Sequence, residues 1–273
     1  MSPWSLQSLQ ENNTAQSDTV ATRHVNLNDG LDVVKPGWSD QWKAREEEYG
    51  VRPIPTAWYK LQEALALDLK HHSSADLKLG TAVQSFEEKG GAGGVTLAFQ
   101  DLADGSSEEI SASFVIGADG YFSRVRERVI GDGLPEYAGT RIWRALVPRT
   151  DEFTSQFVVG GGADTFTFIN YACDATQACW VLSKAEKEPS RNLHNFSTQA
   201  ETNDADIGRA AIEEVCEIMR DAPEDILAMI RETDPTSVTS HGVYIRDPFQ
   251  ADAQVWKPAK GPWTLVGDAG ENH

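Results

Sequence analysis

The segment FVIGADGYFSRVR, residues 114–126, has the pattern of a strand, a tight turn and the start of a helix. The apolar run 114–116 is typical of a short buried strand. Gly117 and Gly120 permit the positive φ angles and the close backbone approach that such a turn requires. Ser123 is a typical N-cap residue, so residues 124–129 are predicted to be helical. The pattern suits an ordinary βα turn, or a turn whose N–H groups face an anion.

A second segment, WTLVGDA at residues 263–269, also runs from a strand into a glycine. The two segments resemble, in the family's order, the "DG" and "GDA" motifs of class A FAD-dependent monooxygenases, which include aromatic hydroxylases and zeaxanthin epoxidase-like enzymes. The resemblance implies that the chain binds FAD through eight residues of these motifs, namely Gly117, Asp119, Gly120, Ser123, Arg126, Gly267, Asp268 and Ala269.

Asp119 and Asp268 are the two carboxylates of these motifs. By resemblance, both hold the cofactor, and Asp268 accepts a hydrogen bond from a ribitol or ribose hydroxyl, which suits an acceptor-only group. The alternative is that each carboxylate bonds its own turn, as Asp often does.

The resemblance implies an activity in which NAD(P)H reduces the flavin and O₂ supplies one oxygen atom to a small aromatic, terpenoid or carotenoid-like substrate. Because the cofactor performs the difficult step, neither a catalytic triad nor a metal site is expected. The alternative is a non-catalytic remnant that acts as a structural or regulatory module.

The sequence departs from the family pattern near both ends. A Gly-x-Gly-x-x-Gly turn, which would cradle the pyrophosphate, is expected near the start and does not occur in the sequence. Glu271 stands where the family has His. These departures predict a partial FAD-binding domain that binds FAD weakly or not at all. An incomplete gene model, a fragment or a degenerate copy would each explain them.

The composition is that of a globular protein of one large or two modest domains: 273 residues, 40% hydrophobic and 9% aromatic. A formal charge of −18 argues against binding to nucleic acid or to anionic membranes. The sequence contains neither an apolar run long enough to span a bilayer nor a secretory signal at its start. Cys173, Cys179 and Cys216 fit no metal-binding spacing, and we expect buried free thiols in a reducing, intracellular compartment.

Residues 53–69 have the apolar spacing of a helix, with Trp58, Leu61, Leu65 and Leu69 on one stripe. The family carries Arg-x-x-Leu at this helix start, where the Arg reaches the flavin nucleotide, and Trp58 takes its place here. Lys60 or Gln62 is a possible substitute. The alternative is a core-facing helix with a solvated Lys60.

Residues 77–87, 95–100 and 109–116 read as three strands, joined by a glycine-rich hairpin loop at 90–94 and a turn at Asp104-Gly105. This β-meander is similar to the crossover within the family's FAD domain. After residue 133 the pattern becomes antiparallel β, with strands predicted at 137–147, 165–171 and 178–183. By resemblance, Arg144 and, less directly, Tyr171 are catalytic candidates. The alternative for each is a structural residue of the sheet.

A polar loop is expected at 186–206, one or two core-packing helices at 207–230 and a strand at 238–246, where His241 is interpreted as structural. The predicted fold is mixed α/β, a partial FAD/NAD(P)-binding Rossmann-like domain with a β-meander plus an antiparallel-sheet substrate domain. The expected ranges are 1–131 for the FAD-binding part, 132–262 for the substrate domain and 263–273 for a strand that returns to the FAD-binding part.

Overall fold

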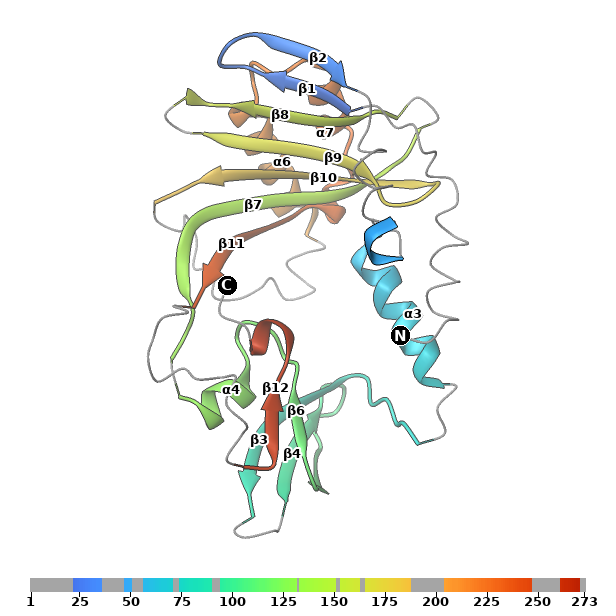
Figure 1. Ribbon diagram of the computed structural model, residues 1–273, viewed down its shortest axis with the longest axis vertical. Coiled ribbons are helices and arrows are strands. Elements are labelled where there is room, and N and C mark those ends of the chain that lie inside the picture. Colours follow the sequence, from blue (N-terminus) through green and yellow to red (C-terminus); the bar gives the residue numbers. More distant parts are fainter. Residues whose placement is uncertain are drawn as a thin grey trace. The chain divides into compact units, whose positions relative to one another are not determined.

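The computed structural model describes residues 22–35, 47–50, 56–70, 74–89, 94–131, 133–150, 153–162, 165–187, 204–246 and 261–270. The chain divides into two compact units (Figure 1). Unit 1 comprises residues 1–75 and 139–243, and unit 2 comprises residues 76–138 and 244–273. Within unit 1 the described residues before position 76 group with the antiparallel sheet, and the expected domain ranges stay a prediction.

Unit 1 is built on a seven-stranded sheet of order β11-β7-β10-β9-β8-β1-β2. Its strands are β1 (Thr22–Asn26), β2 (Leu31–Lys35), β7 (Glu136–Pro148), β8 (Ser155–Gly160), β9 (Phe166–Ala172), β10 (Gln177–Ala185) and β11 (Thr239–Ile245). β7, β10, β9 and β8 pair antiparallel, whereas β1 pairs parallel with β8. The predicted antiparallel strands are therefore confirmed.

Two helices, α6 (Ala205–Ile218) and α7 (Glu224–Arg231), pack on one face of this sheet (Figure 1). Trp143, Phe168 and Trp180 from the strands are fully buried, as are Val215 and Ile226 from the helices. The predicted core-packing helices are confirmed, and the break between them precedes Pro223, which lacks the N–H that a continuous helix requires.

The hairpin of β1 and β2 was not predicted, because residues 1–31 show no sustained hydrophobic period. Its turn nevertheless carries a signal, since Asp29 accepts a hydrogen bond from the N–H of Leu31 and Gly30 has a φ of 75°. Such Asp and Gly residues are typical of tight turns.

The helix predicted at 53–69 is α3 (Trp58–Lys70), but its orientation differs from the prediction. Trp58, Leu65 and Leu69 of the apolar stripe are exposed, whereas Ala57 and Ala64 are buried. Polar contacts, rather than the apolar stripe, determine the orientation of the helix. Tyr59 donates to Gln177 at 2.6 Å, and Lys60 pairs with the buried Asp174. The expectation of a core-facing stripe with a solvated Lys60 is therefore wrong.

Unit 2 contains the predicted β-meander, formed by β3 (Thr81–Glu88), β4 (Val95–Asp101) and β5 (Ser107–Ala112) in antiparallel order. β6 (Val115–Gly117) leads into α4 (Arg124–Val129), and β12 (Trp263–Leu265) pairs parallel with β6. The core of this unit contains Phe86, Val95, Val115 and Val125. The predicted mixed α/β fold with a meander and an antiparallel sheet is confirmed.

The strand at 114–116 is less buried than predicted. Val115 is buried, but Phe114 and Ile116 are exposed. Side chains alternate along a strand, so only one face of β6 packs on the core of unit 2. The loop at 90–94, the loop at 186–206 and Glu271 lie wholly or mostly outside the described residues.

Candidate cofactor site and candidate substrate face

The two motif segments meet in unit 2. In the parallel pair β6–β12, Ile116 lies opposite Thr264 and Gly117 opposite Leu265. The N–H of Val266 donates to the carbonyl of Gly117 at 2.9 Å. Because both strands run in the same direction, the "DG" turn and the "GDA" turn leave the same edge of this sheet.

The glycines of the two turns are needed for two different reasons. At Gly117, an added Cβ would lie 2.6 Å from Leu265 Cδ2 and 2.9 Å from Val125 Cγ1, so only glycine permits this packing. Gly120 and Gly267 instead have φ angles of 78° and 58°, and an added Cβ would meet nothing within 4 Å. Both turns therefore present open backbone surface to an incoming ligand.

The side chain of Asp119 caps the helix that follows it. Its carboxylate accepts hydrogen bonds from the hydroxyl of Ser123 and from the backbone N–H groups of Arg124, at 2.8 Å, and Val125, at 3.3 Å. Ser123 in turn accepts from the N–H of Arg126 at 2.9 Å, as expected of an N-cap. This geometry matches the alternative in which Asp119 bonds its own turn, and its role toward the cofactor stays a prediction.

Arg126 joins the two motifs. Its side chain is fully buried, and Nη1 donates to the carbonyl oxygen of Ala269 at 3.1 Å. Ala269 belongs to a single 3₁₀ turn, η3 (Gly267–Ala269), and is itself buried. Arg126 thus links α4 to the turn that carries Asp268, and its predicted contact with the cofactor stays a prediction.

Asp268 is the second carboxylate of this site, and like Asp119 it is exposed. Within the part of the chain that the structure describes, its side chain has no hydrogen-bond or ion-pair partner. A carboxylate held on a fixed turn with its oxygen lone pairs unused can accept hydrogen bonds from ligand hydroxyl groups. The geometry therefore fits the predicted ribose or ribitol contact.

Arg246 is a residue of this region that the sequence did not reveal. It donates to the carbonyl oxygens of Gly133, at 2.7 Å, and Tyr121, at 3.0 Å, and so holds the chain on either side of α4. Tyr244 packs edge-on against Phe122 and Tyr137, with ring centroids 5.7 Å apart in both pairs. The contacts are long-range, so no local pattern signals them.

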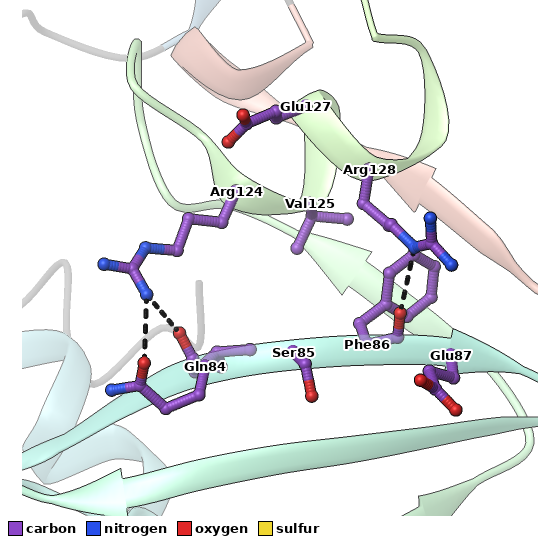
Figure 2. A pocket seen from close by; sticks show the side chains of 9 residues that line it. Gln84, Ser85, Phe86, Glu87, Arg124, Val125, Glu127 and Arg128 are labelled. Carbon is purple, nitrogen blue, oxygen red and sulfur yellow. Dashed lines mark hydrogen bonds between the residues drawn. The ribbon is translucent and has the colours of Figure 1, made fainter.

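A pocket of about 690 Å³ lies between α4 and β3 (Figure 2). Arg124 donates to the carbonyl of Val83 and the side chain of Gln84, and Arg128 donates to the carbonyl of Phe86. None of the predicted site residues lines this pocket. The two arginines attach α4 to β3 here.

In unit 1 the predicted residues Arg144 and Tyr171 lie on the same face of the sheet. Arg144 is opposite Val181, Val181 is opposite Ile169, and Tyr171 follows two residues later. Because side chains alternate, this face is the one turned away from Trp143, Phe168 and Trp180. We call it the open face of the sheet.

The charge of Arg144 affects several neighbouring groups on the open face. Its Nε donates to Thr239 Oγ1 at 3.3 Å, and its charge lowers the pKa of neighbouring groups. Burial raises the pKa of Tyr171, an effect that Cys179 reinforces and Arg144 opposes, so the phenol stays protonated. On this face Arg144 is thus an exposed cation and Tyr171 a neutral hydroxyl group.

His241 lies on the neighbouring strand β11. Burial, with a smaller contribution from the charge of Arg144, lowers the pKa of His241 to about 4. The imidazole is therefore neutral at pH 7. This residue was interpreted from the sequence as structural, and its position adds a neutral hydrogen-bonding group near Arg144.

The lowered pKa of His241 predicts a pH-dependent stability. Between pH 6.5 and 4 the unfolded chain binds a proton that the folded chain does not, so the free energy of unfolding falls as the pH decreases. We expect a loss of about 2 kcal/mol relative to His241→Gln, allowing for the part of the ring that water reaches. Denaturant unfolding of the unchanged protein and of His241→Gln at pH 7, 5.5 and 4.5 measures this loss. A difference in stability between the two proteins that does not vary with pH would contradict the prediction.

The family model for the FAD binding domain matches residues 45–203, more than half of the chain. The chain therefore belongs to this FAD-binding family, within the class A FAD-dependent monooxygenases.

Two curated relatives match parts of the chain in sequence. The 6-hydroxynicotinate 3-monooxygenase of Pseudomonas fluorescens is 31% identical over 140 residues, 46% of this chain and 34% of the relative. The 3-hydroxybenzoate 6-hydroxylase 1 of Aquipseudomonas alcaligenes is 44% identical over 50 residues, 18% of this chain and 12% of the relative. The chain thus matches about a third of the length of the first relative.

Among solved structures, Klebsiella pneumoniae HpxO, complexed with FAD and uric acid, aligns with a TM-score of 0.63 and 19% identity. The alignment covers 97% of this chain and 59% of that one. The 2,6-dihydroxypyridine-3-hydroxylase of Arthrobacter nicotinovorans aligns with a TM-score of 0.58 and 15% identity, covering 98% and 66%. At these identities the likeness establishes the fold. None of the helices that the structure describes is long and apolar enough to cross a membrane.

Proposed function

We propose that the chain contributes the cofactor turns and the substrate face of an FAD-dependent monooxygenase that uses NAD(P)H and O₂. The observation that carries the proposal is the parallel pairing of β6 and β12, which brings the "DG" and "GDA" turns to one sheet edge. The buried hydrogen bond from Arg126 to Ala269 then holds these turns together.

In this proposal each motif residue has a defined task. Asp268 accepts a hydrogen bond from a ribityl or ribose hydroxyl, and Gly120 and Gly267 leave room for the cofactor beside the backbone. Asp119 and Ser123 hold the first turn of α4, and Arg126 holds the η3 turn. Bound FAD supplies the redox chemistry and the activation of O₂.

The substrate that we propose is a small hydroxylated aromatic compound, with an anionic form favoured. Arg144 is an exposed guanidinium on the open face, suited to a carboxylate or a phenolate. Tyr171 and His241 add neutral groups that can bond ring substituents. The names of the relatives, a hydroxynicotinate and a hydroxybenzoate enzyme, support this class over terpenoids and carotenoids.

The proposal predicts that Asp268→Ala weakens FAD binding by roughly 10- to 100-fold. The lost interaction is a hydrogen bond to a charged acceptor, which contributes about 1.5–3 kcal/mol. Flavin fluorescence titration over a wide FAD range measures the two dissociation constants. The matched control is Asp76→Ala, which removes another exposed carboxylate of unit 2 outside both motifs.

The control must be a carboxylate without structural contacts, and Asp174, which also lies outside the motifs, does not meet this condition. It is buried, pairs with Lys60 and bonds Thr176 and Gln177, so its loss would disturb the β9–β10 turn. If Asp268→Ala and Asp76→Ala bind FAD equally well, Asp268 does not contact the cofactor.

The activity itself is tested by NAD(P)H consumption. Purified protein is incubated with FAD, desalted and examined for flavin absorbance. A separate sample with excess FAD is assayed for substrate-stimulated NADH or NADPH oxidation with 6-hydroxynicotinate and 3-hydroxybenzoate. Stimulation that Arg144→Met reduces supports the proposed substrate face. Absence of flavin binding at any concentration would instead favour a structural or regulatory module.

A further inference from the structure

Two of the three cysteines meet at one end of the open face. In the β9–β10 hairpin, Cys179 lies directly opposite Tyr171, and Cys173 follows Tyr171 by two residues. The N–H of Cys173 donates to the carbonyl of Gln177 at 2.9 Å, so the pairing continues past the end of β9. Cys173 and Cys179 are therefore diagonal neighbours on the same face of the hairpin.

The two thiols share one small apolar cluster with Ala57 of the segment that leads into α3. Cys173 is 1% exposed and Cys179 is 8% exposed. Both cysteines are therefore buried, and Cys179 is the more exposed of the two.

The surroundings give the two sulfurs opposite acid–base properties. Hydrogen bonding to Cys173 and to the Tyr171 hydroxyl, together with the charge of Arg144, outweighs burial and lowers the pKa of Cys179 to about 7. Hydrogen bonding to Cys179 and burial raise the pKa of Cys173 well above its ordinary value. The surroundings thus favour Cys179 over Cys173 as the sulfur that ionises.

Cys216 provides an internal comparison. It lies on α6 and is only half-buried, and desolvation raises the pKa of its thiol. It belongs to neither the hairpin nor the cluster of Cys173 and Cys179. Exposure alone would make Cys216 the more reactive cysteine, whereas thiolate character favours Cys179.

We propose that Cys173 and Cys179 form a redox-active pair that hydrogen peroxide oxidises to an intramolecular disulfide. The Cys179 thiolate attacks one peroxide oxygen, the O–O bond breaks, and the released hydroxide takes up a proton to give water. Cys173 then attacks the sulfenic sulfur, the S–S bond forms, and the hydroxyl leaves with the Cys173 proton as a second water. Two thiols and one peroxide thus give one disulfide and two waters.

Formation of this disulfide would alter the open face directly. Tyr171 would lose the thiolate acceptor for its hydroxyl hydrogen bond, and the negative charge that faces Arg144 would disappear. The pair therefore links the oxidation state of the protein to the two predicted substrate residues. The chemistry itself does not depend on the proposed monooxygenase activity.

The sequence allows a direct test by mass spectrometry. Trypsin cleaves after Arg149 and Lys184, so Cys173 and Cys179 lie on one peptide, residues 150–184. Cys216 lies on a separate peptide, residues 210–220. The folded protein is treated with increasing hydrogen peroxide, quenched with acid, alkylated in denaturant and digested.

We expect peptide 150–184 to become two hydrogens lighter and resistant to alkylation at peroxide doses that leave Cys216 fully alkylated. Dithiothreitol should restore both alkylation sites, and the oxidation rate should rise as the pH increases through about 7. Equal or faster loss of Cys216, or full alkylation of Cys173 and Cys179 at every dose, would overturn the proposal.

Two variants separate the roles of the pair. Cys173→Ser removes the second thiol, so a dimedone-reactive sulfenic acid should accumulate at Cys179. Cys179→Ser should leave Cys173 reduced at the same peroxide dose. The fluorescence of the buried Trp143 and Trp180 verifies that each variant is folded. A folded Cys173→Ser protein without a dimedone adduct would show that Cys179 is not the attacking sulfur.

Discussion

Arg126→Ala is expected to destabilise unit 2 by about 3–5 kcal/mol, since it leaves both a cavity and an unbonded carbonyl. Arg126 is fully buried, and its Nη1 donates to the carbonyl oxygen of the buried Ala269. The η3 turn, which carries Asp268, would lose its connection to α4, so FAD affinity should fall as well. Hydrogen-exchange mass spectrometry of peptides that cover α4 and β12 measures the local loss of stability.

Two further variants separate the contributions at this position. Arg126→Met retains most of the side-chain volume, so its expected cost of about 1.5–3 kcal/mol comes from the lost hydrogen bond. Arg128→Ala, on the same helix, is the matched control, because Arg128 is exposed and its hydrogen bond to Phe86 is 3.4 Å long. Unchanged exchange in Arg126→Ala, or an equal effect of Arg128→Ala, would refute the positioning role.

The local parts of the candidate cofactor site were predictable from the sequence, because they depend on residues close together in the chain. The strand, the turn at Gly117 to Gly120 and the N-cap at Ser123 are each set within a few residues. The hydrogen bond between Arg126 and Ala269 spans 143 positions, so no local pattern could reveal it. Only the family resemblance brought these two segments together in advance.

The prediction for α3 failed for a related reason. A helical hydrophobic period shows which residues share a stripe, but the partners available in the fold decide which stripe is buried. Here Tyr59 and Lys60 contact Gln177 and Asp174, which are more than a hundred positions away. These contacts orient α3 so that Trp58 and Leu69 remain exposed.

For the cysteines, the register of strand pairing gives information that the sequence alone does not. Their sequence positions predicted free thiols, and the described thiols are free, with Cys173 and Cys179 buried and Cys216 only partly so. That Cys173 and Cys179 are neighbours follows from the hairpin turn at residues 173–176, where Asp174 bonds Thr176 and Gln177. A register shifted by one residue would have placed them on opposite faces.

The open face also depends on the packing behind the sheet. Gly208 of α6 lies against the 3₁₀ turn η2 (Pro235–Ser237), which leads directly into β11. Ser237 donates to the carbonyl of Leu146 at 3.2 Å, and Thr239 accepts from Arg144. The position of α6 therefore influences where Arg144 and His241 lie.

Gly208→Ala is accordingly expected to destabilise unit 1 by about 3 kcal/mol, at the upper end of the usual cost of overpacking. The added Cβ would lie 1.9 Å from the carbonyl oxygen of Pro235, and this backbone atom cannot move aside as a flexible side chain can. In an isolated helix the same change would stabilise by about 1 kcal/mol, so the predicted effect has the opposite sign.

Denaturant unfolding followed by the fluorescence of Trp143 and Trp180 measures the effect of Gly208→Ala, since both indoles are buried in the core of unit 1. Glu213→Ala, an exposed change in the same helix, is the control and should alter stability by no more than about 0.5 kcal/mol. A stabilised Gly208→Ala protein would mean that α6 does not approach η2 as closely as described. The support proposed for Arg144 through β11 would then be wrong as well.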